Sequence, residues 1–139
     1  MPTTFTYPAK IIIAWGEAIS GNAKIRQWLM ANGYPELGLF VHALYNQDGA
    51  REWLIKNGFP HLMALINAAE GNKQAMTWLE KGQFTLLALI AQAADNDDDA
   101  LFKLGVMPEK EWFIIAQKIR IVKNQIEYDN NDVHRISRD

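Results

Sequence analysis

Apolar residues in the middle of the chain recur at the three- and four-residue steps of an α-helix. Starting from Phe59, they fall at Leu62, Leu65, Ile66 and Ala69. Residues at this spacing share one face of a helix, so the stretch predicts an amphipathic helix with a buried stripe. A shorter stripe follows at Ala75, Trp78 and Leu79. We therefore predict two short helices that form a hairpin.

The same pattern returns every 25 residues. Its columns are tryptophan (Trp28, Trp53, Trp78), an aromatic residue (Tyr34, Phe59, Phe84), leucine (Leu37, Leu62, Leu87) and alanine (Ala43, Ala68, Ala93). Several columns in one register indicate an internal repeat, and chance would align one at most. Small alanine side chains would allow neighbouring helices to approach closely.

Weaker copies flank these three units. Tyr7-Pro8 begins one, with Gly16 at the alanine column, and Met107-Pro108 begins another, with Ala116 there. Terminal repeats are expected to differ, because one of their sides faces water instead of a neighbour.

Capping residues separate the predicted helices. Asn22, Asp48 and Asn72 are suitable N-caps, because their side-chain oxygens can accept orphan backbone N–H groups. The tryptophan helices are followed by Gly33, Gly58 and Gly82, which fit a left-handed C-cap. Proline then opens the next helix at a position that needs no N–H donor.

These signals predict an all-α fold of class α-solenoid, with about four stacked 25-residue hairpins and a longer C-terminal helix. The predicted helices are 8–19, 23–32, 35–46, 49–57, 60–70, 73–81, 84–94, 97–104 and 109–128. We expect residues 1–128 to form one helical-repeat domain and residues 129–139 to form a polar, flexible tail.

The amino-acid composition and net charge limit the classes of function that the protein can have. The formal net charge of −2 argues against a dedicated nucleic-acid binder, which normally carries a basic excess. Cysteine is absent, which removes disulfides and thiolate ligands and is compatible with a reducing compartment. The apolar run at residues 10–15 is too short for a secretory or membrane segment, so we expect a cytoplasmic protein.

Residues 58–82 resemble an ankyrin repeat through Ala68-Ala69, Gly71-Asn72 and Trp78-Leu79. Ankyrin units have about 33 residues and include a hairpin finger, for which a 25-residue unit leaves no room. Residues 7–128 look more like short, uncharacterised bacterial proteins built from Trp-Leu-x-x-Asn-Gly hairpins. That resemblance implies a fold and, weakly, a binding role. It implies no catalytic residues.

The candidate ligand sites all have a structural explanation that we favour. The tryptophan column lies beside leucine on the apolar face, which is typical of a core. The acidic run at 95–100 resembles half of an EF-hand loop, but Ala100 and Val106 replace its glycine and its glutamate. Acidic residues that cap a helix N-terminus explain the run better. His42, His61 and His134 show no ligand spacing.

Two segments suggest partners. The final helix carries Lys110, Lys118, Arg120 and Lys123, which could meet an acidic protein or a nucleic-acid backbone; we favour a solvated face, because acidic residues interrupt it. The first helix has apolar residues around it and no upstream neighbour. Either residues 3–7 cover it, or a homodimer forms through Ile11, Ile12, Ile13 and Trp15.

The favoured function is a non-enzymatic helical-repeat scaffold for protein–protein interaction. We predict no catalytic residue, cofactor or metal site. Partner contacts are expected at repeat positions that vary while the core columns hold: Arg26, Arg51, Met76, Glu36, His61 and Thr85. The alternatives are a ligand-binding or enzymatic protein with a pocket between helices, and a nucleic-acid binder that reads the phosphate backbone.

Overall fold

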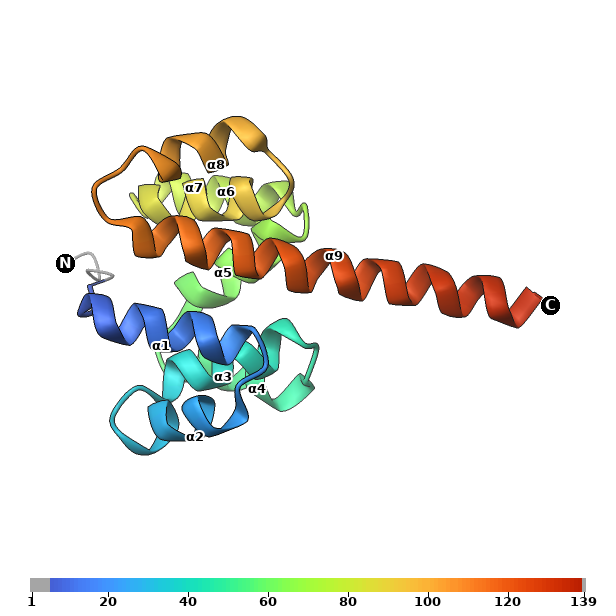
Figure 1. Ribbon diagram of the computed structural model, residues 1–139, viewed down its shortest axis with the longest axis horizontal. Coiled ribbons are helices and arrows are strands. Elements are labelled where there is room, and N and C mark those ends of the chain that lie inside the picture. The colour runs from blue at the N-terminus through green and yellow to red at the C-terminus, as the bar shows by residue number, and fades with distance from the viewer. Residues whose placement is uncertain (1–5, 139) are drawn as a thin grey trace.

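The computed structural model describes residues 6–138, apart from the side chains of Asp48 and of residues 131–138. Within this range the chain forms nine α-helices and no β-strand (Figure 1). The helices are α1 (Ala9–Ile19), α2 (Ala23–Ala31), α3 (Pro35–Leu44), α4 (Asp48–Lys56), α5 (Pro60–Ala69), α6 (Lys73–Lys81), α7 (Thr85–Ala94), α8 (Asp98–Gly105) and α9 (Lys110–Arg138). The predicted all-α class is therefore confirmed.

The helices keep the 25-residue period. The even-numbered helices begin at Ala23, Asp48, Lys73 and Asp98, and the odd-numbered ones from α3 onward begin at Pro35, Pro60, Thr85 and Lys110. The odd-numbered helices supply most of the core. Two core columns are Ile12, Leu37, Leu62, Leu87 and Trp112, and Trp15, Phe40, Leu65, Ile90 and Ile115, all buried. Equivalent residues of five helices thus meet in one interior.

The alanine column continues into α1 at Ala18, which is buried and stands 25 residues before Ala43. The prediction that Gly16 occupies this column is wrong. The Tyr7-Pro8 pair that suggested it lies 27 residues before Tyr34-Pro35, so it is out of register with the other units. Gly16 instead lies where α9 approaches α1, with Ile115 and Lys118 close to its backbone.

The hairpins do not form an open-ended stack, because α9 packs against both α1 and α7 (Figure 1). Helix α9 thus connects the first unit, which contains α1, to the unit that contains α7. This changes the expectation for the first helix. Ile11, Ile12 and Trp15 are buried within the chain, and only Ile13 remains exposed. The apolar surface proposed there for a homodimer is therefore mostly absent, since α9 supplies the missing neighbour.

The predicted caps are found at two of three positions. The side chain of Asn22 accepts a hydrogen bond from the backbone N–H of Ile25, and that of Asn72 accepts one from Ala75. Asp48 is not the N-cap: α4 is preceded by Gln47, whose side chain makes no capping hydrogen bond. At the C-terminal side of α6 the positive φ falls on Gln83, at 65°, and not on the predicted Gly82.

The final helix extends further than predicted. It continues through residues 129–138, which the sequence suggested to be a polar, flexible tail. A hydrogen bond of 2.9 Å from Gln125 Nε2 to Asp129 Oδ1, one turn later, spans the predicted boundary. The C-terminal part of α9 projects beyond the other helices in Figure 1. No described helix has both the length and the apolar character needed to cross a membrane.

Candidate functional site

A groove opens on the outer side of the molecule between α4, α5 and α6. Its volume is about 400 Å³. The lining residues are Ile55, Pro60, Met63, Ala64, Asn67, Asn72, Gln74, Ala75 and Trp78. None of them carries a charge. The groove therefore combines an apolar surface with side-chain amides that can exchange hydrogen bonds.

The groove differs from the equivalent surface of the preceding unit at two repeat positions. Met30 and Gly38 are replaced by Ile55 and Met63 one repeat later. In the earlier unit the side chain of Met30 occupies the space above Gly38, which has no Cβ atom. In the later unit Met63 is buried and lines the groove. Ile55 remains 58% exposed, whereas Met30 is 37% exposed. The result is an open groove with an exposed isoleucine.

The tryptophan column lies mostly at the surface, so the prediction of a buried ladder is wrong. Trp28 and Trp78 are 48% and 45% exposed, and Trp53 is half-buried. The adjacent leucines, Leu29, Leu54 and Leu79, are buried instead. Trp78 stacks on Phe84 with ring centroids 5.7 Å apart and planes at 8°. This stacking orients the Trp78 ring at the groove.

Three predicted partner residues lie on the even-numbered helices and are half-buried: Arg26, Arg51 and Met76. Arg51 is held inside the chain. It donates to the carbonyl oxygen of Ala43 at 3.2 Å and to Asn46 Oδ1 at 2.8 Å, and it pairs with Glu70 at 3.3 Å. Met76 packs against the core cluster. Arg51 thus has a structural role, because it donates to a carbonyl group at the end of α3.

Of the other three residues predicted to contact a partner, Glu36 and His61 are buried and Thr85 is exposed. Glu36 accepts a hydrogen bond of 2.7 Å from the hydroxyl of Tyr7. His61 stacks on Phe84 with centroids 5.2 Å apart and planes at 4°. Burial and the neighbouring Glu36 raise the pKa of Tyr7 well above its usual value. Burial lowers the pKa of His61, although the charge of Glu36 opposes this shift.

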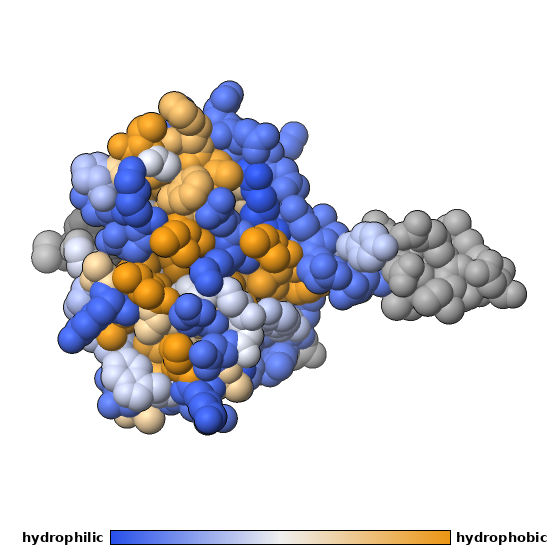
Figure 2. Space-filling model, in the orientation of Figure 1, coloured by the Kyte–Doolittle hydropathy of each residue, from blue (hydrophilic) through white to orange (hydrophobic). Residues whose placement is uncertain are grey.

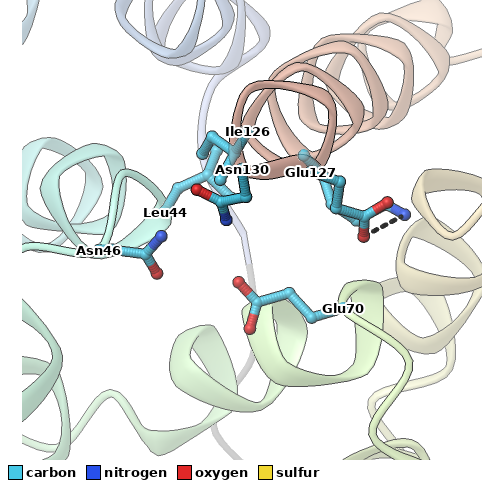
Figure 3. Close-up of a pocket in the computed structure, with 7 residues that line it drawn as sticks. Leu44, Asn46, Glu70, Ile126, Glu127 and Asn130 are labelled. Atoms are coloured by element: carbon cyan, nitrogen blue, oxygen red, sulfur yellow. Dashed lines mark hydrogen bonds and ion pairs between the residues drawn. The ribbon is translucent and has the colours of Figure 1, made fainter. Parts of the chain in front are cut away.

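A polar pocket of about 200 Å³ lies where α9 passes the ends of α3 and α5. Asn46, Glu70 and Asn130 point into it from three segments of the chain (Figure 3). Lys123 is almost fully buried beside it, with its Nζ 3.4 Å from Asp95 Oδ1 and 3.5 Å from Glu127 Oε1. Both carboxylates neutralise this ammonium group. The buried charge of Lys123 is therefore balanced by residues of the chain itself, without a ligand in the pocket.

The other predicted charged sites have structural roles. Asp97 caps α8 by accepting a hydrogen bond from the N–H of Ala100, which supports the capping interpretation of the acidic run. Arg120 bonds to Ala93 and Asp98, so this basic residue of α9 is also engaged within the chain. No group of three or more metal-ligating side chains occurs among the described residues. His42 is half-buried, and His134 lies outside the described side chains.

Comparisons with known proteins add no assignment. The chain matches no family model, no curated protein and no solved structure. The candidate site must therefore be judged from its own residues. The residues that line the groove include no acid, base or nucleophilic group.

Proposed function

We propose that this protein is a non-enzymatic helical-repeat scaffold that binds another protein through the groove between α4, α5 and α6. The observation that carries the proposal is the groove itself, which is uncharged along its whole lining and has Ile55 and Trp78 exposed at it. Exposed aromatic and aliphatic side chains around a hollow are typical of protein-binding surfaces, where tryptophan is enriched among the strongest contributors.

The lining defines the chemistry of the partner. An apolar side chain of the partner would enter between Ile55 and Trp78 and contact Met63. The amides of Asn67 and Gln74 would exchange hydrogen bonds with backbone groups of the same segment. A charged side chain would lose hydration in the groove without gaining an ion pair, which is unfavourable. The preferred partner is therefore an uncharged segment with an exposed apolar anchor.

Selection from a random peptide library displayed on phage, followed by titration of the recovered peptides, tests this proposal. We expect the selected sequences to carry an apolar anchor and no charge next to it. Ile55→Asp should weaken their binding at least tenfold, because it places a carboxylate at the groove. Ile13→Asp is the matched control, since Ile13 has a similar exposure of 54% but lies on α1.

Two outcomes would count against the groove. The first is selection of strongly charged peptides. The second is binding that Ile55→Asp leaves unchanged while Ile13→Asp abolishes it, which would move the contact to α1. A cytoplasmic location is part of the proposal and is compatible with the absence of cysteine.

A further inference from the structure

A second exposed apolar surface lies away from the groove, on helices α1 and α9, which run side by side. The two helices pack together and point in the same direction (Figure 1). Ile13 of α1 and Ile114 and Ile121 of α9 are 54%, 39% and 66% exposed. Figure 2 shows hydrophobic areas over α1, α9 and α8 on one face of the molecule. Hydrophilic side chains separate these areas in the figure, and such a mixture of exposed apolar and polar residues is typical of a protein interface.

The apolar residues of α9 continue along the helix. Ile114, Ile121 and Tyr128 are spaced by seven residues, or about two helical turns, so they form one line on its surface. Tyr128 is 58% exposed and lies where α9 extends past the end of α1. A helix that leaves its own domain is only marginally stable in water without a neighbour. This line therefore indicates a neighbouring helix from outside the chain.

A hollow lies beside the same stretch of α9. It measures about 440 Å³ and begins at Ser20, where α1 has ended. Its other lining residues are Tyr45, Lys118, Ile121, Val122, Gln125, Ile126 and Asp129. A helix that lay along α1 and continued in the same direction would reach this hollow next. The exposed line and the hollow thus suit each other in shape and in apolar character.

Charges on the two helices are arranged in complementary order. On α1, Lys10 precedes Glu17 by seven residues; on α9, Glu111 precedes Lys118 by seven. Glu17 and Lys118 lie level with each other, with Oε2 and Nζ 4.0 Å apart. Along α1 the order is positive then negative, and along α9 it is negative then positive. Two parallel helices with these sequences attract each other at both ends.

We propose that a second copy of this chain binds here, with a two-fold axis parallel to α1 and α9. The axis places α9 of each copy along α1 of the other. Lys10 then meets Glu111 of the second copy and Ile13 meets its Ile114. The Glu17–Lys118 pair, which each chain already forms within itself, comes next to the same pair of the second copy. Further along, Ile121 and Tyr128 of one copy enter the hollow of the other. The interface is isologous, so every contact occurs twice.

Charge reversal tests the pairing directly. The wild-type protein should sediment at twice its chain mass of 15.8 kDa. Lys10→Glu alone and Glu111→Lys alone should each weaken the dimer at least tenfold, because each creates two like-charge contacts. An equimolar mixture of the two variants should regain the dimer, because the glutamate introduced at position 10 of one chain faces the lysine introduced at position 111 of the other. Loss of folding in either variant would not be reversed by mixing.

A second mixture fixes the direction of the helices. An antiparallel arrangement would pair Lys10 with Glu17 of the second copy, so Lys10→Glu mixed with Glu17→Lys would regain the dimer only in that geometry. Ile13→Asp should also abolish the dimer, whereas Ile55→Asp should leave it intact. These two variants have the reverse effects on peptide binding to the groove, so the two proposals can fail separately.

Any of the following results would overturn the proposal: a wild-type protein that stays monomeric at several hundred micromolar, a dimer that survives Ile13→Asp, or rescue by Glu17→Lys in place of Glu111→Lys. A small molecule retained in the hollow of a monomeric protein would also overturn it, because it would show a different occupant.

Discussion

Arg120 donates a hydrogen bond of 2.8 Å from its Nε to the carbonyl oxygen of Ala93, near the end of α7. Arg51 makes the same bond to Ala43, two repeats earlier in the alanine column, at 3.2 Å. The last carbonyl groups of a helix have no partner within it, and a guanidinium group both bonds to them and complements the negative end of the dipole. In this way Arg120 ties α9 to α7.

We expect Arg120→Ala to lower the free energy of unfolding by about 1.5–3 kcal/mol, because a charged hydrogen bond to a part-buried carbonyl is lost. Urea unfolding followed by circular dichroism would measure it. Arg120 also pairs with Asp98, whose side chain is 86% exposed. Asp98→Ala should therefore cost less than about 1 kcal/mol. Equal losses in the two variants would show that the bond to Ala93 contributes little.

Much of the local structure follows from the sequence. Proline at the first turn, asparagine at the N-cap and apolar residues at helical spacing act within a few residues, and the helices from α2 to α8 begin within about two residues of their predicted starts. The 25-residue columns also predicted which leucines and alanines are buried, such as Leu62 and Ala68.

Two features depend on contacts between distant segments and could not be predicted this way. Trp78 and Leu79 are neighbours about 100° apart on a helix, so hydrophobicity alone cannot decide which of them points inward. Closure by α9 brings Lys118 and Ile115 against Gly16 of α1, about 100 residues away in sequence. The three residues Ile11, Ile12 and Trp15 of α1 are also buried in this closed arrangement, in which α9 packs on α1. The groove was also missed, since it depends on how the side chains of three packed helices, such as Ile55, Met63 and Trp78, lie relative to one another.

Leu79 and Trp78 should respond differently to truncation. Leu79 is fully buried, so Leu79→Ala should destabilise the protein by about 2–5 kcal/mol through lost burial and a cavity. Trp78→Ala removes a half-exposed ring and its stacking on Phe84, for which we expect about 1–2 kcal/mol. Chemical denaturation of both variants would compare them. A larger loss for Trp78→Ala would restore the prediction of a tryptophan core.

The alanine column should resist enlargement. Ala68 is 2% exposed, and the added atoms of Ala68→Leu have no space, so we expect a loss of about 1–3 kcal/mol from overpacking. Ala31→Leu is the matched control, because Ala31 is exposed in α2 and leucine has a similar helix propensity. Thermal unfolding of the two variants would show the difference, and similar midpoints would indicate that the column tolerates bulk.

Stability should fall in mild acid because His61 is buried and neutral. Its pKa is lowered by burial in the folded protein, whereas in the unfolded chain it returns to about 6.5. The unfolded state therefore binds more protons as the pH drops through and below this value, and protonation favours unfolding.

His61→Phe keeps a flat ring against Phe84 and removes the titrating group. Denaturant unfolding at pH 7 and pH 5 should show a smaller loss of stability in His61→Phe than in the wild type. Some loss should persist, because burial and the charge of Arg26 also lower the pKa of His42. An unchanged difference between the two pH values would mean that His61 is not the group whose protonation opposes folding.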